Sequence, residues 1–269
     1  MRPQYSARAN SRGQPMLRIE LEDIAIDIGE PVLGHSRSDL IRYYWSGHPR
    51  FLFFQSVPYG AKFLDLGAGS GGLSGWKRWG IPPREDIRMF ALDKIQHSDY
   101  ARYEDFRIVD VDQGGIPYPP DFFDAVYASH ILEHIANLEG AIAGIKKTLK
   151  PGGQVYVEVP TPETKAYPPR EDLAKQGLEV AASSFFDDRT HLDTYSADGW
   201  AEQFRQQGFK LRQYGIIRNP YLEEELLSLG VKTNDRELMT YGLWSRLCWA
   251  QYLVLEADCG NAKEPDHET

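Results

Sequence analysis

The sequence predicts an α/β fold built on a doubly wound, mostly parallel sheet, because short apolar runs alternate with helical patterns along the chain. The apolar runs expected as strands lie at 63–66, 89–93, 107–112, 122–129 and 154–160. A cluster of glycines follows the first run, as in a tight strand-to-helix turn, and an amphipathic helix precedes the last. These three observations favour a parallel sheet with helices as its crossovers.

The segment before the first run is expected to contain one strand and one interrupted helix. Residues 1–15 are polar and without periodicity, which predicts a disordered arm. Residues 16–28 alternate between apolar and charged side chains, which predicts one half-buried strand with a bend near its middle. Residues 38–54 are helical in part, with Ser38 as the expected N-cap and Gly47 as the interruption.

Two further helices are expected beyond the fourth run. In the first, apolar residues recur at the spacing of one helix face: Leu138, Ala141, Ile142, Ile145 and Leu149. Lysines fill its last turn, and the Pro-Gly-Gly sequence at 151–153 stops it. The second begins at its cap, Ser196, and turns Trp200 and Phe204 inward.

One domain is expected, at residues 16–258. Two closing strands are expected at 210–218 and 243–257, the second of which could begin as a helix. Two inserted segments, 161–195 and 219–241, interrupt the alternation of strands and helices. No repeat or low-complexity tract divides the chain further.

Composition and charge exclude several classes of protein. The chain has 269 residues, of which 42% are hydrophobic and 26% charged, so it can bury a sizeable core without disulfide or metal staples. A net charge of −9 disfavours a dedicated nucleic-acid binder. Two cysteines without a CxxC motif, no apolar leader and no run long enough for a membrane span predict a cytoplasmic protein without a membrane partner. The polar residues 259–269 are expected as a frayed tail.

The glycine turn at 65–71, Asp-Leu-Gly-Ala-Gly-Ser-Gly, is the first candidate site. Only glycine lets a backbone approach a ligand this closely and accept a positive φ. The motif alone is weak evidence, because Gly67 to Gly72 also satisfies the dinucleotide spacing GxGxxG. It predicts a ligand site without saying which ligand.

Acidic residues at three successive strand ends narrow the choice of ligand for the glycine turn. Asp65 precedes the glycines, Asp93 ends the second expected strand and Asp112 ends the third. A carboxylate at the edge of such a sheet can accept hydrogen bonds from both hydroxyls of a ribose. Three acids suit a ligand that is cationic at one end and has no phosphate, whereas a pyrophosphate prefers a helix N-terminus with less acid nearby.

The order of four motifs, LDLGAGSG, ALD, VDVDQGGIPYPPDFFDAVYASHILEHI and LKPGGQVYVEVP, resembles the class I S-adenosylmethionine-dependent methyltransferases over residues 61–217. The segment ending in ASHILEHI is similar to the small-molecule branch with ubiquinone-pathway and sugar O-methyltransferases. The resemblance implies a Rossmann-like sheet of seven strands in the order 3-2-1-4-5-7-6, with the last antiparallel. It also implies a cofactor half at about 61–160 and an acceptor lid formed by the inserts 161–195 and 219–241.

The resemblance also implies roles for single residues. The glycine turn and Asp65 would contact the methionine end of S-adenosylmethionine, and Asp93 would take the ribose hydroxyls. Asp112 with Gln113 would frame the adenine, and Ser129 would line the methyl-donor side. The full cofactor-binding set is Asp65, Gly67, Ala68, Gly69, Gly71, Asp93, Lys94, Asp112, Gln113 and Ser129. One departure is the short stretch after the glycines, which carries Trp76 and Trp79 where small aliphatic residues are usual.

Three histidines are the candidate catalytic residues: His130, His134 and His191. Methylating a hydroxyl requires removal of its proton, and histidine titrates near neutrality, so His134 or His191 is expected as the general base. The resemblance implies that His130, like Ser129, lines the methyl-donor side. In a helix, His130, Glu133 and His134 would share a face and with His191 could bind a divalent cation, but bracing of the strand-to-helix turn is the preferred interpretation and no metal is expected.

The acceptor is expected near the second half of the chain, with Phe185, Phe186, Arg189 and Tyr195 as substrate-binding residues. The predicted function is O-methylation of a small-molecule or carbohydrate acceptor, with S-adenosylhomocysteine as the second product. Three alternatives stay open: an RNA or protein methyltransferase, a non-catalytic cofactor-binding pseudoenzyme and, more distantly, an NAD-binding enzyme.

Overall fold

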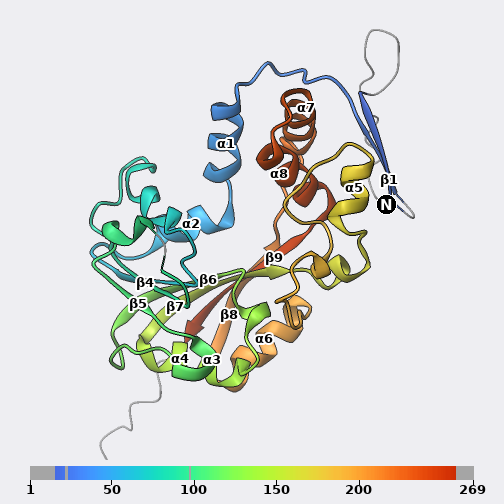
Figure 1. Cartoon of the computed structure of the whole chain (residues 1–269). Coiled ribbons are helices and arrows are strands. Elements are labelled where there is room, and N and C mark those ends of the chain that lie inside the picture. The colour runs from blue at the N-terminus through green and yellow to red at the C-terminus, as the bar shows by residue number, and fades with distance from the viewer. Residues whose placement is uncertain (1–15, 22–23, 97, 259–269) are drawn as a thin grey trace, which may run out of the picture. The chain divides into compact units, whose positions relative to one another are not determined.

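The computed structural model describes residues 16–21, 24–96 and 98–258 (Figure 1). The expected arm at 1–15 and tail at 259–269 lie outside these residues. The chain forms two compact units, each built from several stretches of sequence. Unit 1 comprises 1–49, 160–191 and 216–251, and unit 2 comprises 50–159, 192–215 and 252–269. Most of both expected inserts therefore falls in unit 1.

Unit 2 holds most of a sheet that has seven strands within the described part of the chain, in the order β5-β4-β3-β6-β7-β9-β8. The strands are β3 (Lys62–Leu66), β4 (Arg88–Asp93), β5 (Asp105–Ile108), β6 (Phe123–Ser129), β7 (Leu149–Pro160), β8 (Phe209–Ile216) and β9 (Ala250–Ala257). β3 pairs in parallel with β4 and β6, and β7 pairs in parallel with β6. Counted from β3, this is the predicted order 3-2-1-4-5-7-6, which is confirmed.

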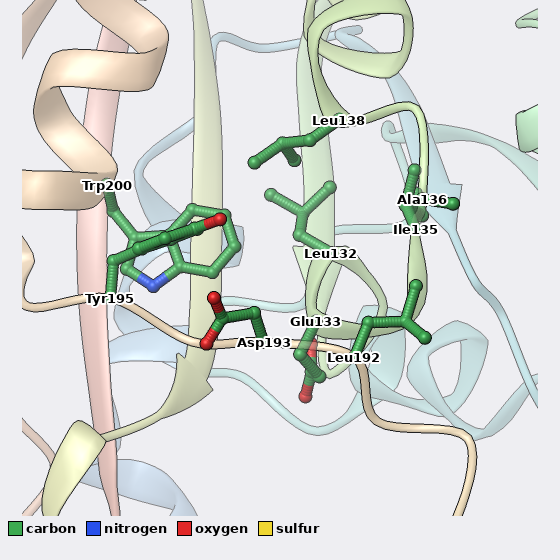
Figure 2. A pocket seen from close by; sticks show the side chains of 9 residues that line it. All are labelled: Leu132, Glu133, Ile135, Ala136, Leu138, Leu192, Asp193, Tyr195 and Trp200. Carbon is green, nitrogen blue, oxygen red and sulfur yellow. The ribbon is translucent and has the colours of Figure 1, made fainter.

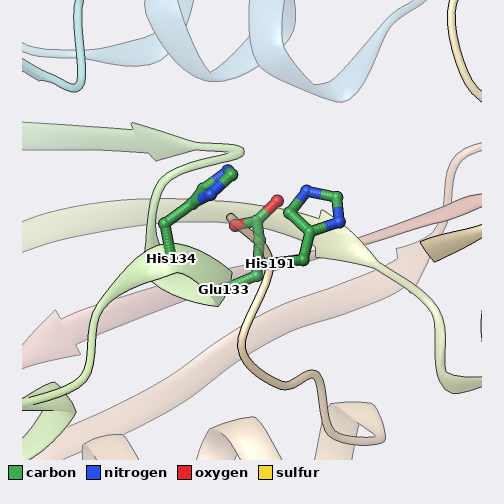
Figure 3. A group of neighbouring side chains, drawn as sticks. All are labelled: Glu133, His134 and His191. Carbon is green, nitrogen blue, oxygen red and sulfur yellow. The ribbon is translucent and has the colours of Figure 1, made fainter. Parts of the chain in front are cut away.

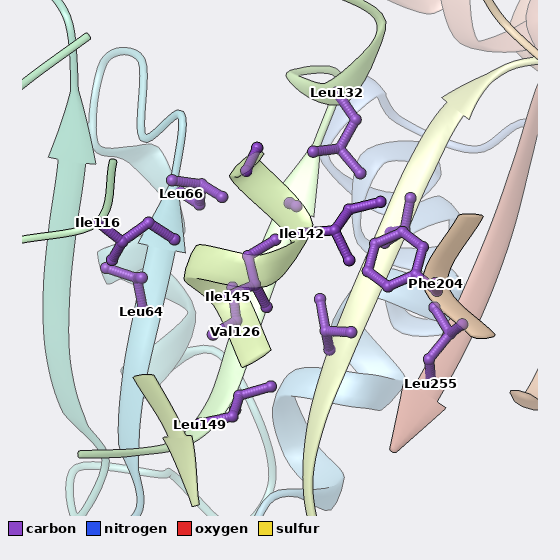
Figure 4. Close-up of a cluster of buried hydrophobic side chains, with 14 of the residues drawn as sticks. Leu64, Leu66, Ile116, Val126, Leu132, Ile142, Ile145, Leu149, Phe204 and Leu255 are labelled. Atoms are coloured by element: carbon purple, nitrogen blue, oxygen red, sulfur yellow. The ribbon is translucent and has the colours of Figure 1, made fainter. Parts of the chain in front are cut away.

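Two helices cover the core of unit 2 with the apolar faces that the sequence predicts. α4 (Leu138–Thr148) is capped by Asn137, and α6 (Ala197–Gln206) is capped by Ser196. Trp200 and Phe204 of α6 are fully buried, in a cluster with residues of β3, β6, β7, β9 and α4 (Figure 4). Burial of each such large side chain stabilises the fold by about 2–3 kcal/mol, so this cluster fixes the sheet against its helices.

Unit 1 contains a two-stranded hairpin with one buried apolar face and a group of helices. β1 (Leu17–Leu21) pairs antiparallel with β2 (Ile24–Ile28), so the prediction of one bent strand at 16–28 is wrong. Alternation has the same period in one long strand and in two paired ones, and therefore could not separate them. The helices are α1 (Arg37–Ser46), α5 (Arg170–Lys175), α7 (Glu223–Thr233) and α8 (Arg236–Leu247). The N-cap of α1 is Ser36, not Ser38.

Short helical turns occupy the loops that carry candidate residues. They are η1 (Gly72–Arg78), η2 (Ser98–Arg102), η3 (Leu132–His134), η4 (Pro162–Ala166) and η5 (Phe185–Asp187). η1 stands where a full α-helix would follow the glycines. Trp76 of η1 and Trp79, its C-cap, pack on α2 (Pro49–Ser56): Trp76 contacts Phe51 and Phe54, and Trp79 contacts Phe51. Among the described residues, no helix combines the length and the apolar character of a membrane span.

Candidate functional site

The glycine turn leaves β3 at the carboxyl edge of the sheet. The amides of Gly67 and Ala68 both donate to the carbonyl of Leu92 on β4, at 2.8 and 3.2 Å. Gly67 has φ +75 and Gly69 has φ +51, which are left-handed values. A Cβ on Gly67 would lie 2.9 Å from the Cβ of Ile131, whereas a Cβ on Gly69 would meet nothing within 4 Å. The turn is therefore clamped at Gly67 and open at Gly69.

Substitution of Gly67 by alanine is expected to cost stability and, if the turn binds the cofactor that the resemblance implies, cofactor binding as well. The new methyl group would clash with a side-chain atom of Ile131 that cannot move without the backbone, and the positive φ adds about 1–2 kcal/mol of strain. Gly60→Ala is the matched control, because Gly60 has φ +73 and a Cβ there meets nothing within 4 Å. Calorimetric titration with S-adenosylhomocysteine should show a loss of at least about tenfold in affinity for Gly67→Ala, equivalent to about 1.4 kcal/mol, and little change for Gly60→Ala. Equal behaviour of the two variants would contradict the clamp.

Asp93, the last residue of β4, joins the glycine turn to the next loop. Its Oδ2 accepts from the amide of Gly69 at 2.8 Å and its Oδ1 from the amide of Ile95 at 3.0 Å. The side chain is half-buried, and each carboxylate oxygen has a second lone pair, so Asp93 can still accept two hydroxyl groups. Lys94, the next residue, is exposed.

Asp65 lies at the floor of the turn and is buried. The hydroxyl of Tyr103 donates to its Oδ2 at 2.5 Å. Burial raises the pKa of Asp65 to about 7, although the Tyr103 hydrogen bond opposes the shift, and nearby Asp93 adds to it. A cationic group at this point would favour the ionised form.

Asp112 does not end a strand, which corrects the prediction for 107–112. β5 stops at Ile108, and residues Val111–Gly114 form the short helix α3, because the side chain of Asp110 caps it by accepting from the amide of Asp112. The Asp112 carboxylate accepts from the amides of Ala136 and Asn137, at 3.2 and 2.9 Å. It thus anchors the loop before α4, while Gln113 beside it is exposed.

The turn after β6 brings His130 to the same edge of the sheet. Ser129 ends β6, and His130 follows with φ +53, outside the helical geometry that the sequence suggested for 130–134. The His130 amide donates to the carbonyl of Glu158 on β7 at 2.8 Å. Its ring lies between two carboxylates, with Nδ1 at 3.3 Å from Glu133 and Nε2 at 3.1 Å from Glu158.

Sequence reasoning missed the ion pair beneath His130. Glu158 is buried and accepts from Arg50 of α2, through Nε at 2.8 Å and through Nη2, and from the hydroxyl of Tyr156 at 2.6 Å. The signal in the sequence was a glutamate inside the apolar run QVYVEVP, which a fully buried strand tolerates only with a partner. The distant arginine could not be assigned to it from spacing.

Glu133 and His134 occupy η3, directly after this turn. Glu133 is buried and His134 is half-buried, and their side chains stand next to each other (Figure 3). His191 is the last residue of its segment of unit 1, where its Nδ1 lies 2.5 Å from the carbonyl oxygen of Phe185. The next residue, Leu192, belongs to unit 2 and donates its amide to the carbonyl of Glu133 at 2.8 Å.

The expected substrate residues are distributed over both units. In unit 1, Phe185 is buried, whereas Phe186 is 65% exposed and Arg189 is exposed. In unit 2, Tyr195 lines a cavity of about 180 Å³ (Figure 2). The other lining residues are Leu132, Glu133, Ile135, Ala136, Leu138, Leu192, Asp193 and Trp200. This cavity is mostly apolar and adjoins η3.

The chain is similar in sequence to known methyltransferases. A family model described as a methyltransferase domain matches residues 37–214. The ubiquinone biosynthesis O-methyltransferase of Dechloromonas aromatica is 26% identical over 186 residues, which are 67% of this chain and 77% of that protein. The highly reducing polyketide synthase ltbA of Aspergillus luteorubrus is 26% identical over 163 residues, and the match covers 54% of this chain but 5% of that protein.

Solved structures share the fold. A methyltransferase in complex with the Trm112 methyltransferase activator of Haloferax volcanii has a TM-score of 0.54 and 20% identity, over 81% of this chain and 89% of that chain. At this identity the likeness concerns the fold alone.

The glycine turn and Asp93 together fit an adenosyl group. The turn is open at Gly69, and the Asp93 carboxylate beside it can accept hydroxyls.

Proposed function

This chain belongs to the methyltransferase-domain family and is a class I S-adenosylmethionine-dependent methyltransferase, and we propose that it methylates a hydroxyl group of a small-molecule or carbohydrate acceptor. The observation that carries the proposal is a half-buried histidine, His134, on the first turn after β6. Ile131, three residues earlier, contacts the glycine turn, so this histidine lies close to the cofactor loop. The relative from Dechloromonas aromatica bears the name of an O-methyltransferase, which supports the same reaction.

Four groups of residues would hold the cofactor in this proposal. The glycine turn with Asp65 would hold the methionine end, Asp93 the ribose, Asp112 with Gln113 the adenine side, and Ser129 the methyl-donor side. The cofactor supplies a methyl group already activated by its sulfonium, so the protein has to align the acceptor oxygen and exclude water rather than provide strong acid or base.

His134 is proposed as the group that accepts the hydroxyl proton, with His191 as the other candidate. A histidine titrates close to neutral pH, which suits a base that must be neutral before transfer and charged after it. The side chain of His134 is accessible in part, as a proton acceptor has to be.

We also propose that the protein acts in the cytoplasm. The sequence has two cysteines and no CxxC motif, which supports this site of action.

The 161–195 insert is proposed to contact the acceptor. The part of this insert that lies in unit 1 is held together by hydrogen bonds, because the Asp187 carboxylate accepts from the amides of Arg170 and Ser183. The indole nitrogens of Trp244 and Trp249 also donate to the carbonyls of Ala182 and Ser183, each at 2.7 Å. An anchored segment of this kind can present Phe186 and Arg189 in fixed positions.

The test is a screen of phenols and sugars for a product heavier by one methyl group, followed by kinetics of single variants. His134→Gln is expected to lower kcat by at least about 100-fold at saturating cofactor, because general-base catalysis contributes 10²–10⁴-fold. His35→Gln is the control, since His35 is also half-buried but precedes α1 in unit 1. Unimpaired His134→Gln and His191→Gln enzymes would remove both residues as bases, and methylation of RNA or protein alone would overturn the acceptor class.

A further inference from the structure

We propose that Glu158 is a positioning residue for methyl transfer, which together with Glu133 holds His130 as a fixed imidazolium beside the cofactor turn. The proposal rests on the proposed function in one respect, that the turn after β6 borders the methyl donor. It assigns to Glu158 and His130 a role different from that of the proposed base, His134.

The Glu158 carboxylate is 1% exposed and has four hydrogen-bonding partners. Two are nitrogens of the Arg50 guanidinium, one is the Tyr156 hydroxyl and one is His130 Nε2. A carboxylate has about four acceptor positions, so these partners use all of them. A buried carboxylate that faces a bidentate guanidinium is held in its ionised form, which can accept hydrogen bonds but cannot donate them.

The ring of His130 must therefore carry a proton on Nε2. On the other side, Nδ1 faces Oε1 of Glu133, whose side chain is also buried. With carboxylate oxygens at both ring nitrogens, the form that satisfies both contacts is the doubly protonated imidazolium. Burial disfavours the charged ring, but the hydrogen bonds to Glu133 and Glu158 outweigh burial and the repulsion from Arg50, and they raise the pKa of His130. An imidazolium has no lone pair with which to take a proton from an acceptor.

The contacts with Glu158 also stabilise the backbone conformation of His130. His130 has φ +53, a left-handed conformation that costs a non-glycine residue free energy. Glu158 offsets this cost twice, since its carbonyl accepts the His130 amide at 2.8 Å and its carboxylate accepts from the ring. The next residue, Ile131, is thereby set against Gly67 of the cofactor turn. Loss of the Glu158 charge should consequently change the position of Ile131 against the cofactor turn as well as the protonation of His130.

The experiment is nitrogen NMR of histidine-labelled protein with S-adenosylhomocysteine, which reports the protonation of each ring nitrogen. Both His130 nitrogens should be protonated at pH 6 in the native protein, and they should stay protonated to a higher pH than in a free histidine, because the hydrogen bonds to Glu133 and Glu158 raise the pKa of the ring. In Glu158→Gln the proton affinity of His130 should fall at least about tenfold, the equivalent of one pKa unit. Tyr156→Phe, which keeps the charge, should leave the ring doubly protonated. Glu223→Gln is the control, because Glu223 is a buried glutamate of unit 1 paired with Arg218.

The native spectrum alone can overturn the proposal, so the result does not depend on whether a variant folds. A His130 nitrogen that is unprotonated at pH 6 would show that the two glutamates do not hold the ring as an imidazolium and that His130 can act as a base. An unchanged His130 titration in a folded Glu158→Gln protein would show that Glu158 does not position the ring. Absence of S-adenosylhomocysteine binding to the native protein would instead contradict the proposed function, and it leaves a distinct calorimetric signature.

Discussion

Asp93→Ala is expected to weaken binding of S-adenosylhomocysteine by about 100-fold. The carboxylate would supply two charge-assisted hydrogen bonds to the ribose hydroxyls, each worth about 1.5 kcal/mol or more, and a loss of about 3 kcal/mol corresponds to 100-fold. Asp93→Ala also removes the acceptor of the Gly69 amide, so the glycine turn would no longer be fixed to β4 at Gly69. Isothermal calorimetry measures the change directly.

The matched control for Asp93 is Asp86. Its Oδ2 accepts from the amide of another loop glycine, Gly60, at 2.9 Å, and the residue pairs with Arg84. Asp86→Ala should lower thermal stability while leaving the affinity of the folded protein nearly unchanged. If both variants lose affinity equally, the effect of Asp93 reflects general loosening and not contact with the ribose.

Asp65→Asn is expected to make the cofactor-free protein more stable above pH 7, by on the order of 3 kcal/mol, and to weaken cofactor binding. Burial raises the folded-state pKa of Asp65 to about 7, above its ordinary value of 3.8. The folded protein therefore binds more protons than the unfolded chain between about pH 4 and 7, so native stability falls as the pH rises through this window and stays lower above it. An amide removes the charge and with it this slope.

Thermal unfolding across pH 4–9 checks the sign. The native protein should lose melting temperature between about pH 4 and 7 more steeply than Asp65→Asn, with a gap of about 5–10 °C at pH 8. Tyr103→Phe removes the hydrogen bond that lowers the Asp65 pKa, and should move the steep part of the native curve to higher pH. Parallel curves for the native protein and Asp65→Asn would mean that Asp65 is not the group that titrates.

Most strands, the helices α4 and α6 and the glycine turn were predictable because each depends on local chemistry. Trp200 and Phe204 follow the spacing of one helix face and are fully buried, and Ser196 caps their helix as expected. Asp93 ends its strand as predicted, since the apolar run and the acid that follows it are adjacent in sequence. The strand order is confirmed, but it came from resemblance to a family and not from periodicity.

The errors lie where a long-range partner or a cap decides the structure. Asp110 caps the short helix α3, so Asp112 lies in this helix and not at a strand end. The Asp112 carboxylate then accepts from the amides of Ala136 and Asn137, 24 and 25 residues further on. The pairing of Arg50 with Glu158 spans 108 residues, and no local pattern identifies it. Two strands folded into a hairpin have the same alternation as one longer strand. Hydrophobic periodicity therefore did not reveal the cap at Asp110 or the distant ion pair of Arg50 with Glu158.

The most direct test is a crystal structure of the protein with S-adenosylhomocysteine. The account predicts that the ribose hydroxyls lie within hydrogen-bond distance of the Asp93 carboxylate, with the homocysteine end over the glycine turn. A ribose bound anywhere else on the molecule, with Asp93 still turned to Gly69 and Ile95 alone, would contradict it.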